Sequence, residues 1–265
     1  MKGIGLACST LSIEGFGETN FDKVFEVAPK IGFKFIEFNC WYPSALTPDT
    51  ILLLKKRSEA AGLIPAAIHL SSGIGGDLCK DFCHKFTAMQ AAKILGAKRV
   101  VFSGCKRGAE GGIEAAIASL KALVPVAEDM GMQLCLENHA DNVLENISDY
   151  RKIFDEISSD CVGLCIDTGH FEAAGVDVDH VIDEFSARVN HIHLKENKEM
   201  GKKSFVRFNE GMTDNHHIVD RMIALGYTGY LSIELSPEIG ETDGRIFTLE
   251  DLALPYKFFS SYEKL

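Results

Sequence analysis

The segment 161–170, CVGLCIDTGH, ends an apolar run with a carboxylate and an imidazole three residues apart. Asp167 and His170 are residue types that bind metal ions or transfer protons. An aspartate here is equally typical of a helix N-cap, where its side chain accepts a backbone hydrogen bond. The segment is compatible with a capped turn and with a reactive centre, so the rest of the chain must distinguish them.

Other apolar runs end in the same way. Glu137 closes MQLCLE, His193 lies in VNHIHL and Glu234 in GYLSIEL. Burying these groups together with Asp167 is unfavourable unless a cation compensates the carboxylates. We therefore predict a divalent metal ion bound by Glu137, Asp167, His193 and Glu234. His191 has the same strand parity as His193 but lies farther from the strand end, so His193 is chosen as the ligand.

These residues must be positioned by regular elements, and short apolar segments alternate with helix-like segments along the whole chain. Glycines precede several of the apolar segments, where they end helices in the left-handed conformation: Gly32, Gly62, Gly96, Gly131 and Gly226. The predicted strands are 3–8, 33–38, 64–70, 98–103, 132–137, 161–167, 189–194 and 229–235, and predicted helices include 48–61, 78–95, 112–130 and 213–225.

Eight strands alternating with helices in 265 residues predict an α/β fold, a single (β/α)8 TIM barrel spanning residues 1–265. A doubly wound open sheet is the alternative, but STLSIEGFGETN does not match a Gly-rich phosphate loop. In a barrel, the carboxyl ends of the strands form one face, where catalytic groups lie. His69 and Glu37, near the ends of the third and second predicted strands, belong to the same face.

The amino-acid composition argues against some classes of partner and location. Lys plus Arg is 27 against 38 for Asp plus Glu, a formal net charge of -11, which argues against nucleic acid as a partner. No apolar run reaches transmembrane length, and MKGIGLACST is a poor signal peptide, so we expect a cytoplasmic protein without membrane contact. The eight cysteines are then expected to be reduced, and Cys79, Cys83 and His84 to form part of a helix rather than a zinc site.

Four segments, LCLENH, CIDTGH, HIHLKE and LSIEL, resemble the signature strand ends of the xylose isomerase-like TIM barrels. That superfamily of sugar phosphate isomerases and epimerases shares its fold with endonuclease IV and includes ketose 3-epimerases, hydroxypyruvate isomerases, and inosose isomerases and dehydratases. The resemblance implies the same four ligands and one divalent ion, Mn²⁺, Zn²⁺ or Co²⁺. It also implies that His170 is a catalytic or substrate-contacting residue beside the ion.

The resemblance implies an isomerase or epimerase (EC 5) of carbohydrate metabolism, acting on a small sugar, keto-polyol or hydroxy-carbonyl substrate. Glu137 and Glu234 would transfer the proton on opposite substrate faces, through an enediolate that the ion stabilises. Phe16 is a candidate for an apolar wall beside Trp41. The expected substrate-binding residues are His69, Glu37, Lys195, Trp41 and Arg207.

Three alternatives remain open. An inosose-type dehydratase would use the same ion but expel a β-hydroxyl group. An endonuclease IV-type phosphodiesterase needs a histidine after the fourth strand, where this chain has Ser103-Gly104-Cys105. A barrel that binds a metal or ligand without turnover is the third. The LKENKEMGKK segment lacks the arginine usual in ketose 3-epimerases, which disfavours a free ketohexose, and the composition is compatible with a homo-oligomer.

Overall fold

The computed structural model describes residues 3–16, 21–235 and 248–263. Eight parallel strands close into a barrel in the order β1-β10-β7-β6-β5-β4-β3-β2. The predicted (β/α)8 TIM barrel and its eight predicted strands are therefore confirmed. The barrel strands are β1 (Gly5–Ser9), β2 (Phe35–Cys40), β3 (Ile64–Ile74), β4 (Arg99–Gly104), β5 (Gln133–Glu137), β6 (Val162–Asp167), β7 (Val189–Leu194) and β10 (Tyr230–Ile233).

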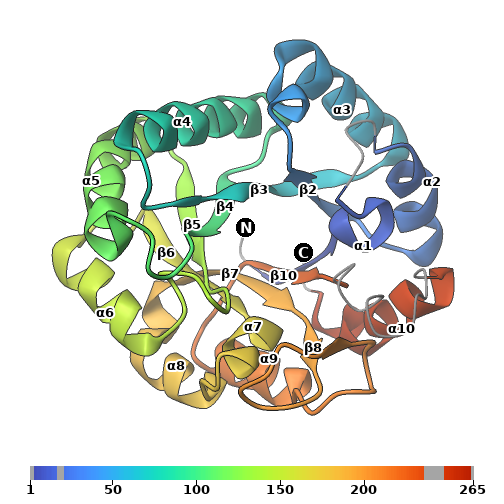
Figure 1. The fold of residues 1–265 in the computed structure, drawn as a ribbon. Helices are drawn as coiled ribbons and strands as arrows, with labels where there is room; N and C mark the ends of the chain where they lie inside the picture. The colour runs from blue at the N-terminus through green and yellow to red at the C-terminus, as the bar shows by residue number, and fades with distance from the viewer. Residues whose placement is uncertain (1–2, 17–20, 236–247, 264–265) are drawn as a thin grey trace.

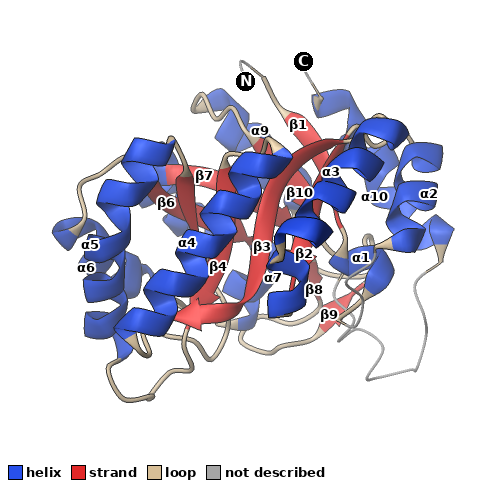
Figure 2. Ribbon diagram, turned by 90° about the horizontal axis from the view of Figure 1, so that it is seen from above, coloured by secondary structure: helices blue, strands red, loops and turns tan. Residues whose placement is uncertain are grey.

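Helices form a ring around the strands (Figure 1), and Figure 2 shows several of them packed along the outer face of the barrel. The four helices predicted from periodicity are present as α3 (Pro48–Ala61), α4 (Leu78–Leu95), α5 (Gly112–Met130) and α9 (Asn215–Ala224). Cys79 and Cys83 lie exposed in α4, as expected for a plain helical pair. The further helices are α1 (Leu11–Glu14), α2 (Asp22–Ile31), α6 (Ile147–Glu156), α7 (Thr168–Ala173), α8 (Val178–Phe185) and α10 (Leu249–Phe259).

Glycine ends the helices where the sequence predicted it. Gly62 has φ +67° after α3, and Gly96 has φ +90° after α4. This left-handed conformation is accessible to glycine without a steric penalty from a Cβ atom. The chain therefore leaves each of these helices sharply and enters the next strand.

Side chains alternate along each strand, which decides what faces the barrel interior. In β5, Leu134 and Leu136 pack in the large apolar core beneath the helices. Cys135, between them, packs instead in a small cluster of inward-facing side chains with Cys165 of β6. Glu137 and Asp167 are two residues farther along the same faces, one layer closer to the carboxyl end of the barrel.

Strand β2 begins and ends two residues later than predicted, which alters the position of Glu37 relative to the strand end. The sequence placed the strand end at residue 38, but β2 continues to Cys40 because Asn39 and Cys40 pair with β3. Asn39 is the register partner of His69. Glu37 therefore lies one inward-facing position below Asn39 and below the strand end.

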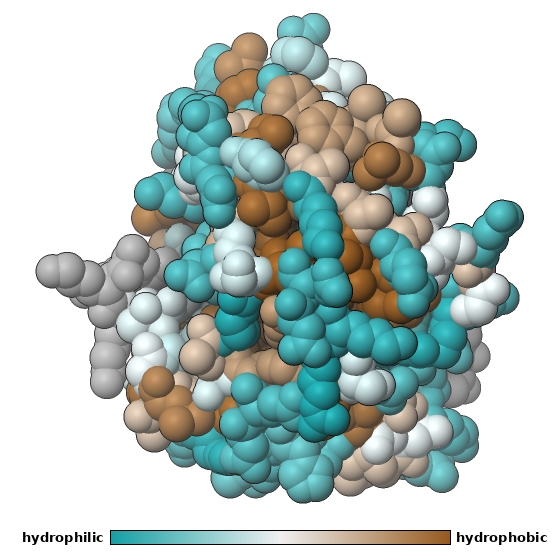
Figure 3. Space-filling view, turned by 90° about the vertical axis from the view of Figure 1, so that its left-hand side faces the viewer, coloured by the Kyte–Doolittle hydropathy of each residue, from teal (hydrophilic) through white to brown (hydrophobic). Residues whose placement is uncertain are grey.

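Beyond β7, the chain forms a small antiparallel pair, β8 (Glu196–Asn197) and β9 (Phe205–Val206). On the side of the molecule that carries α4, α5 and α6, polar and apolar side chains are interspersed at the surface (Figure 3). None of the helices in the described ranges is long and apolar enough to cross a membrane. Association between copies of the chain stays a prediction.

Candidate metal centre and active-site cavity

The last four strands of the barrel bring the four predicted ligands together. Donor atoms of Glu137, Asp167, His193 and Glu234 all lie within 4.8 Å of one another, and all four side chains are buried. Nδ1 of His193 lies 2.7 Å from Oε1 of Glu137 and 3.1 Å from Oε2 of Glu234. Asp167 and His193 are register partners of adjacent strands, which places them at the same level.

Asp167 both caps a helix and faces the cluster. Its Oδ1 accepts a hydrogen bond from the backbone N–H of His170 at 2.9 Å, which caps α7. Its Oδ2 lies 2.8 Å from Nζ of Lys195. The two interpretations of this residue from sequence are therefore compatible, because each uses a different carboxylate oxygen.

Lys195 supplies a positive charge to the carboxylates. Its buried Nζ lies 2.8 Å from Oε1 of Glu234 as well as from Asp167. Burial alone would lower the pKa of Lys195, but Asp167 and Glu234 outweigh that effect and raise it. Lys195 is thus held as an ammonium group between two of the predicted ligands.

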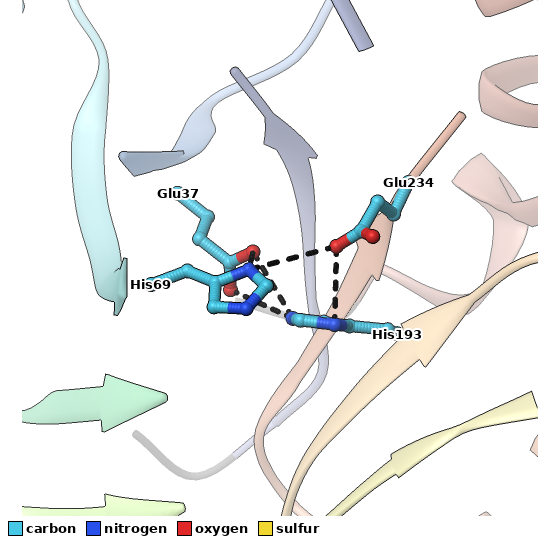
Figure 4. Close-up of side chains that lie close together, drawn as sticks. All are labelled: Glu37, His69, His193 and Glu234. Atoms are coloured by element: carbon cyan, nitrogen blue, oxygen red, sulfur yellow. Dashed lines mark hydrogen bonds and ion pairs between the residues drawn. The ribbon is translucent and has the colours of Figure 1, made fainter. Parts of the chain in front are cut away.

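A second group of possible donor atoms overlaps the first (Figure 4). It comprises Glu37, His69 and His193, from strands β2, β3 and β7, and Glu234, the residue that follows β10. Glu37 is engaged with imidazoles: its Oε2 lies 2.7 Å from Nε2 of His191, and its Oε1 lies 3.0 Å from Nε2 of His193. This group is therefore better described as a hydrogen-bonded network beneath the first cluster than as a separate ion site.

The residues of the first cluster fit a divalent ion. Three carboxylates and one imidazole are the nitrogen and oxygen donors that Mn²⁺, Zn²⁺ and Co²⁺ accept. Oε2 of Glu234 is buried, and although Nδ1 of His193 lies 3.1 Å away, no residue in the described ranges donates to it with hydrogen-bond geometry. A buried carboxylate oxygen of this kind is stabilised by a cation. The donor set does not distinguish among the three ions.

A cavity of about 360 Å³ lies against the cluster. Of the residues predicted to act in catalysis or substrate binding, Glu137, Glu234 and His170 line it, as do His69, Lys195 and Trp41. Phe16, predicted to form an apolar wall, also lines the cavity. The other described lining residues were not predicted from the sequence: Leu11, Tyr42, Leu70, Ser71, Ser103 and His139.

Two residues expected to bind substrate lie elsewhere. Glu37 is fully buried among the imidazoles and is not among the described residues that line the cavity. Arg207 is also absent from that lining, and its Nε donates to Oδ1 of Asp251 in α10 at 2.8 Å. Glu37 differs because β2 ends at Cys40 rather than at residue 38, and Arg207 differs because it is held by a partner 44 residues away in sequence.

One wall of the cavity is aromatic. The rings of Phe16 and Trp41 have centroids 5.5 Å apart, and those of Trp41 and His69 5.3 Å apart. Glu137 and Glu234 also line the cavity, so it combines apolar and charged surfaces. This combination suits a small polyol or sugar, which has C–H faces as well as polar oxygens.

His170 is a neutral hydrogen-bonding group. Burial, Lys195 and His139 together hold the pKa of His170 well below its usual value. The backbone N–H of Ala140 donates to its Nδ1 at 3.5 Å. A neutral imidazole that accepts at Nδ1 carries its proton on Nε2. His170 can therefore donate a hydrogen bond from that nitrogen to an oxygen atom.

Glu137 is held as a carboxylate. Burial would raise the pKa of Glu137, but the imidazoles of His69 and His193 outweigh burial and bring that pKa well below its usual value. Nε2 of His69 lies 3.1 Å from Oε2 of Glu137. The negative charge of Glu137 is thus available to a cation in the cluster.

The chain is similar in sequence and fold to several known proteins. The chain is 24% identical over 251 residues to inosose dehydratase of Geobacillus thermodenitrificans (strain NG80-2), covering 82% of this chain and 83% of that protein. The D-allulose 3-epimerase of Methylomonas sp. in complex with D-allulose has a similar fold, with a TM-score of 0.79 and 16% identity over 99% of this chain and 98% of that one. The IolI protein with a bound zinc atom gives a TM-score of 0.77 with 19% identity, covering 98% of this chain and 100% of that one.

The two relatives are named as a dehydratase of inosose and an epimerase of D-allulose. The family model of the xylose isomerase-like TIM barrel matches residues 25–248. The chain therefore belongs to the xylose isomerase-like TIM barrel family.

Proposed function

We propose that this protein is a divalent-metal-dependent isomerase or epimerase that acts on a small sugar, keto-polyol or hydroxy-carbonyl compound. The observation that carries the proposal is the position of Glu137 and Glu234. Both line the cavity, and both have donor atoms within 4.8 Å of those of Asp167 and His193. Two carboxylates beside one cavity can remove a proton from a bound substrate and return it.

The proposed reaction removes a proton from a carbon beside a carbonyl group. A divalent ion held by Glu137, Asp167, His193 and Glu234 would polarise that carbonyl and stabilise negative charge on its oxygen. Glu137 and Glu234 are the groups proposed to accept and return the proton. His170 is proposed to hold a substrate oxygen by donating a hydrogen bond.

The cavity supports a small and uncharged substrate. Its volume of about 360 Å³ lies at the lower end of the range for ligand pockets. Among the described lining residues, the lysine is Lys195, which already pairs with Asp167 and Glu234. Arg207 pairs with Asp251 outside the cavity lining. These pairings favour a neutral polyol or keto compound over one that carries a phosphate group.

A dehydratase is the second candidate, because an inosose dehydratase is among the relatives of the chain and matches 82% of it. Dehydration begins with the same removal of a proton beside a carbonyl. It then requires loss of a hydroxyl group from the next carbon and a group that protonates it. The two reactions therefore share the proposed site and differ in the fate of the substrate oxygen.

Incubation with a panel of ketoses and inososes in D₂O with Mn²⁺ tests the proposal. An isomerase or epimerase places deuterium on a substrate carbon without loss of water, as NMR and mass spectrometry would show. A dehydratase gives a product lighter by one water molecule. If no substrate in the panel exchanges or reacts while the protein binds the ion, a binding role without turnover replaces the proposal.

A further inference from the structure

The side-chain oxygen of Asn39 is fully engaged. Asn39 is buried in β2, and its Oδ1 accepts from Oγ of Ser9 at 2.8 Å, from Oγ1 of Thr10 at 2.9 Å and from the backbone N–H of Leu11 at 2.9 Å. Three donors around one atom identify it as the amide oxygen. The amide nitrogen must then face the opposite side, where His69 lies.

The amide nitrogen determines which nitrogen of His69 carries the proton. Nδ2 of Asn39 lies 3.0 Å from Nδ1 of His69. An amide nitrogen only donates hydrogen bonds, so Nδ1 of His69 must accept. An imidazole that accepts at Nδ1 is neutral and carries its proton on Nε2, which in His69 lies 3.1 Å from Oε2 of Glu137. His69 therefore donates to Glu137.

We propose that Asn39 is a positioning residue for the proposed proton transfer, because it fixes His69 as an N–H donor that holds Oε2 of Glu137. The other oxygen of Glu137, Oε1, then faces Nδ1 of His193 and the cluster. The catalytic part of this inference rests on the proposed function. The proton position on His69 does not, because it follows from hydrogen bonds within the protein.

Strand β2 places one hydrogen-bond acceptor and one donor beside two imidazoles. Glu37 and Asn39 are two residues apart and so face the same side of the strand. Glu37 accepts from Nε2 of His193, whereas Asn39 donates to Nδ1 of His69. Figure 4 shows Glu37 in contact with His193 and with His69, which extend from separate strands. As a result, His193 presents Nδ1 to the cluster, and His69 presents an N–H group to Glu137.

The position of the proton can be observed directly. Long-range ¹H–¹⁵N correlation NMR on the metal-free full-length chain, labelled at its histidine imidazoles, distinguishes protonated from unprotonated ring nitrogens. A His69→Gln variant identifies the His69 signals among those of nine histidines. We expect an unprotonated Nδ1 and a protonated Nε2 in His69. A proton on Nδ1 of the unmodified protein would overturn the proposal.

Asn39→Asp replaces the amide nitrogen that faces His69 with a carboxylate oxygen and adds a negative charge, while the other oxygen can still accept from Ser9, Thr10 and Leu11. The donor toward Nδ1 becomes an acceptor, so Nδ1 of His69 should gain a proton. Ser9→Ala is the matched control: it perturbs Asn39 from its oxygen side and should leave the protonation of His69 unchanged. An Asn39→Asp protein whose Nδ1 stays unprotonated would contradict the inference.

Turnover provides the second measurement. In Asn39→Asp, His69 can keep its Nε2 proton and gain one on Nδ1, which makes it a cation beside Glu137 and weakens Glu137 as a base. Alternatively, the single proton moves from Nε2 to Nδ1, and Oε2 of Glu137 loses its hydrogen-bond donor. In both cases we expect kcat to fall between about 10-fold and 100-fold with little change in KM. Ser9→Ala should retain most of the activity. If Asn39→Asp shifts the NMR signals but keeps full kcat, the positioning role is wrong.

The two proposals fail in different ways. An unmodified protein with the expected His69 signals but without proton exchange on any substrate would remove the proposed function alone. An active protein with a proton on Nδ1 of His69 would remove the role of Asn39 alone. If Asn39→Asp does not fold, the spectrum of the unmodified protein still decides the proton position.

Discussion

Nζ of Lys195 lies 2.8 Å from Oδ2 of Asp167, so one of the proposed ligands already has a cationic partner inside the barrel. The same ammonium group contacts Glu234. The metal-free protein is thus stabilised by a lysine where the loaded protein would also have an ion. This relationship has a measurable consequence for stability.

Lys195→Met should destabilise the metal-free protein by about 3 kcal/mol, because Asp167 and Glu234 would remain buried without a partner. Urea denaturation measures the change. Excess Zn²⁺ should restore more stability to the variant than to the unmodified protein, since the ion compensates the same carboxylates. Lys198→Met, which alters an exposed lysine three residues away, is the control. An equal loss with and without Zn²⁺ would count against an ion at this cluster.

Glu234→Gln should reduce turnover by about 10²-fold to 10⁴-fold, because the amide cannot accept the substrate proton. Glutamine has the shape of glutamate and can still accept from Lys195, so the protein should fold. Solvent deuterium incorporation measures the first effect and circular dichroism the second. Glu210→Gln, at an exposed loop residue, serves as the control. Full activity in Glu234→Gln would remove Glu234 from the proposed proton transfer.

Glu37→Ala should weaken ion binding by between about 10-fold and 100-fold, although Glu37 is not a proposed ligand. A carboxylate that accepts from the outer nitrogen of a metal-binding imidazole orients the ring and makes it a stronger ligand. Glu37 lies 3.0 Å from Nε2 of His193, the nitrogen that faces away from Glu137. Competition titration with a chromophoric chelator gives the affinity. Glu37→Gln retains an acceptor and should lose less; unchanged affinity in both variants would contradict this role.

Stability should fall as the pH rises between about 4.5 and 7 because of Glu172. Burial, with contributions from Glu196 and Asp167 and despite a hydrogen bond from Thr213, raises the pKa of Glu172 from its ordinary value of 4.5 to about 7. The protonated form is favoured by folding, so this contribution is complete below pH 4.5 and lost above pH 7. We expect an effect of the order of 1 kcal/mol after solvent screening.

The variant Glu172→Gln tests the contribution of Glu172 to the pH dependence of stability. The variant should be more stable than the unmodified protein at pH 8 and nearly equal to it at pH 4.5, as urea denaturation at each pH would show. Glu199→Gln, which changes an exposed glutamate, should leave the pH dependence in place. A pH profile that is identical in Glu172→Gln and the unmodified protein would contradict the assignment.

Much of the fold could be predicted from the sequence because its signals are local. The alternation of apolar strands with amphipathic helices, and glycines such as Gly62 and Gly96 with positive φ, are properties of short segments. The clustering of Glu137, Asp167, His193 and Glu234 also followed, since parallel strands in a barrel end at the same face. Each of these residues needed only its own strand to be placed correctly.

The roles of Glu37, Arg207 and Asn39 could not be predicted in the same way. Glu37 lies deeper than expected because pairing with β3 extends β2 to Cys40. Arg207 binds Asp251, a residue 44 positions away, rather than lining the cavity. The only indication of Asn39 in the sequence was its position two residues after Glu37, which places it on the same face of β2.

The sequence by itself determined the barrel, the level of the four proposed ligands and the residue types that meet there, since strand period and strand order follow from local pattern. Only the tertiary structure decided which atom of each side chain faces which partner. The oxygens of Asp167 divide between a helix N-terminus and Lys195, and the nitrogens of His69 between Asn39 and Glu137. Such assignments depend on distances of a few ångströms between strands far apart in the chain, which no local pattern specifies.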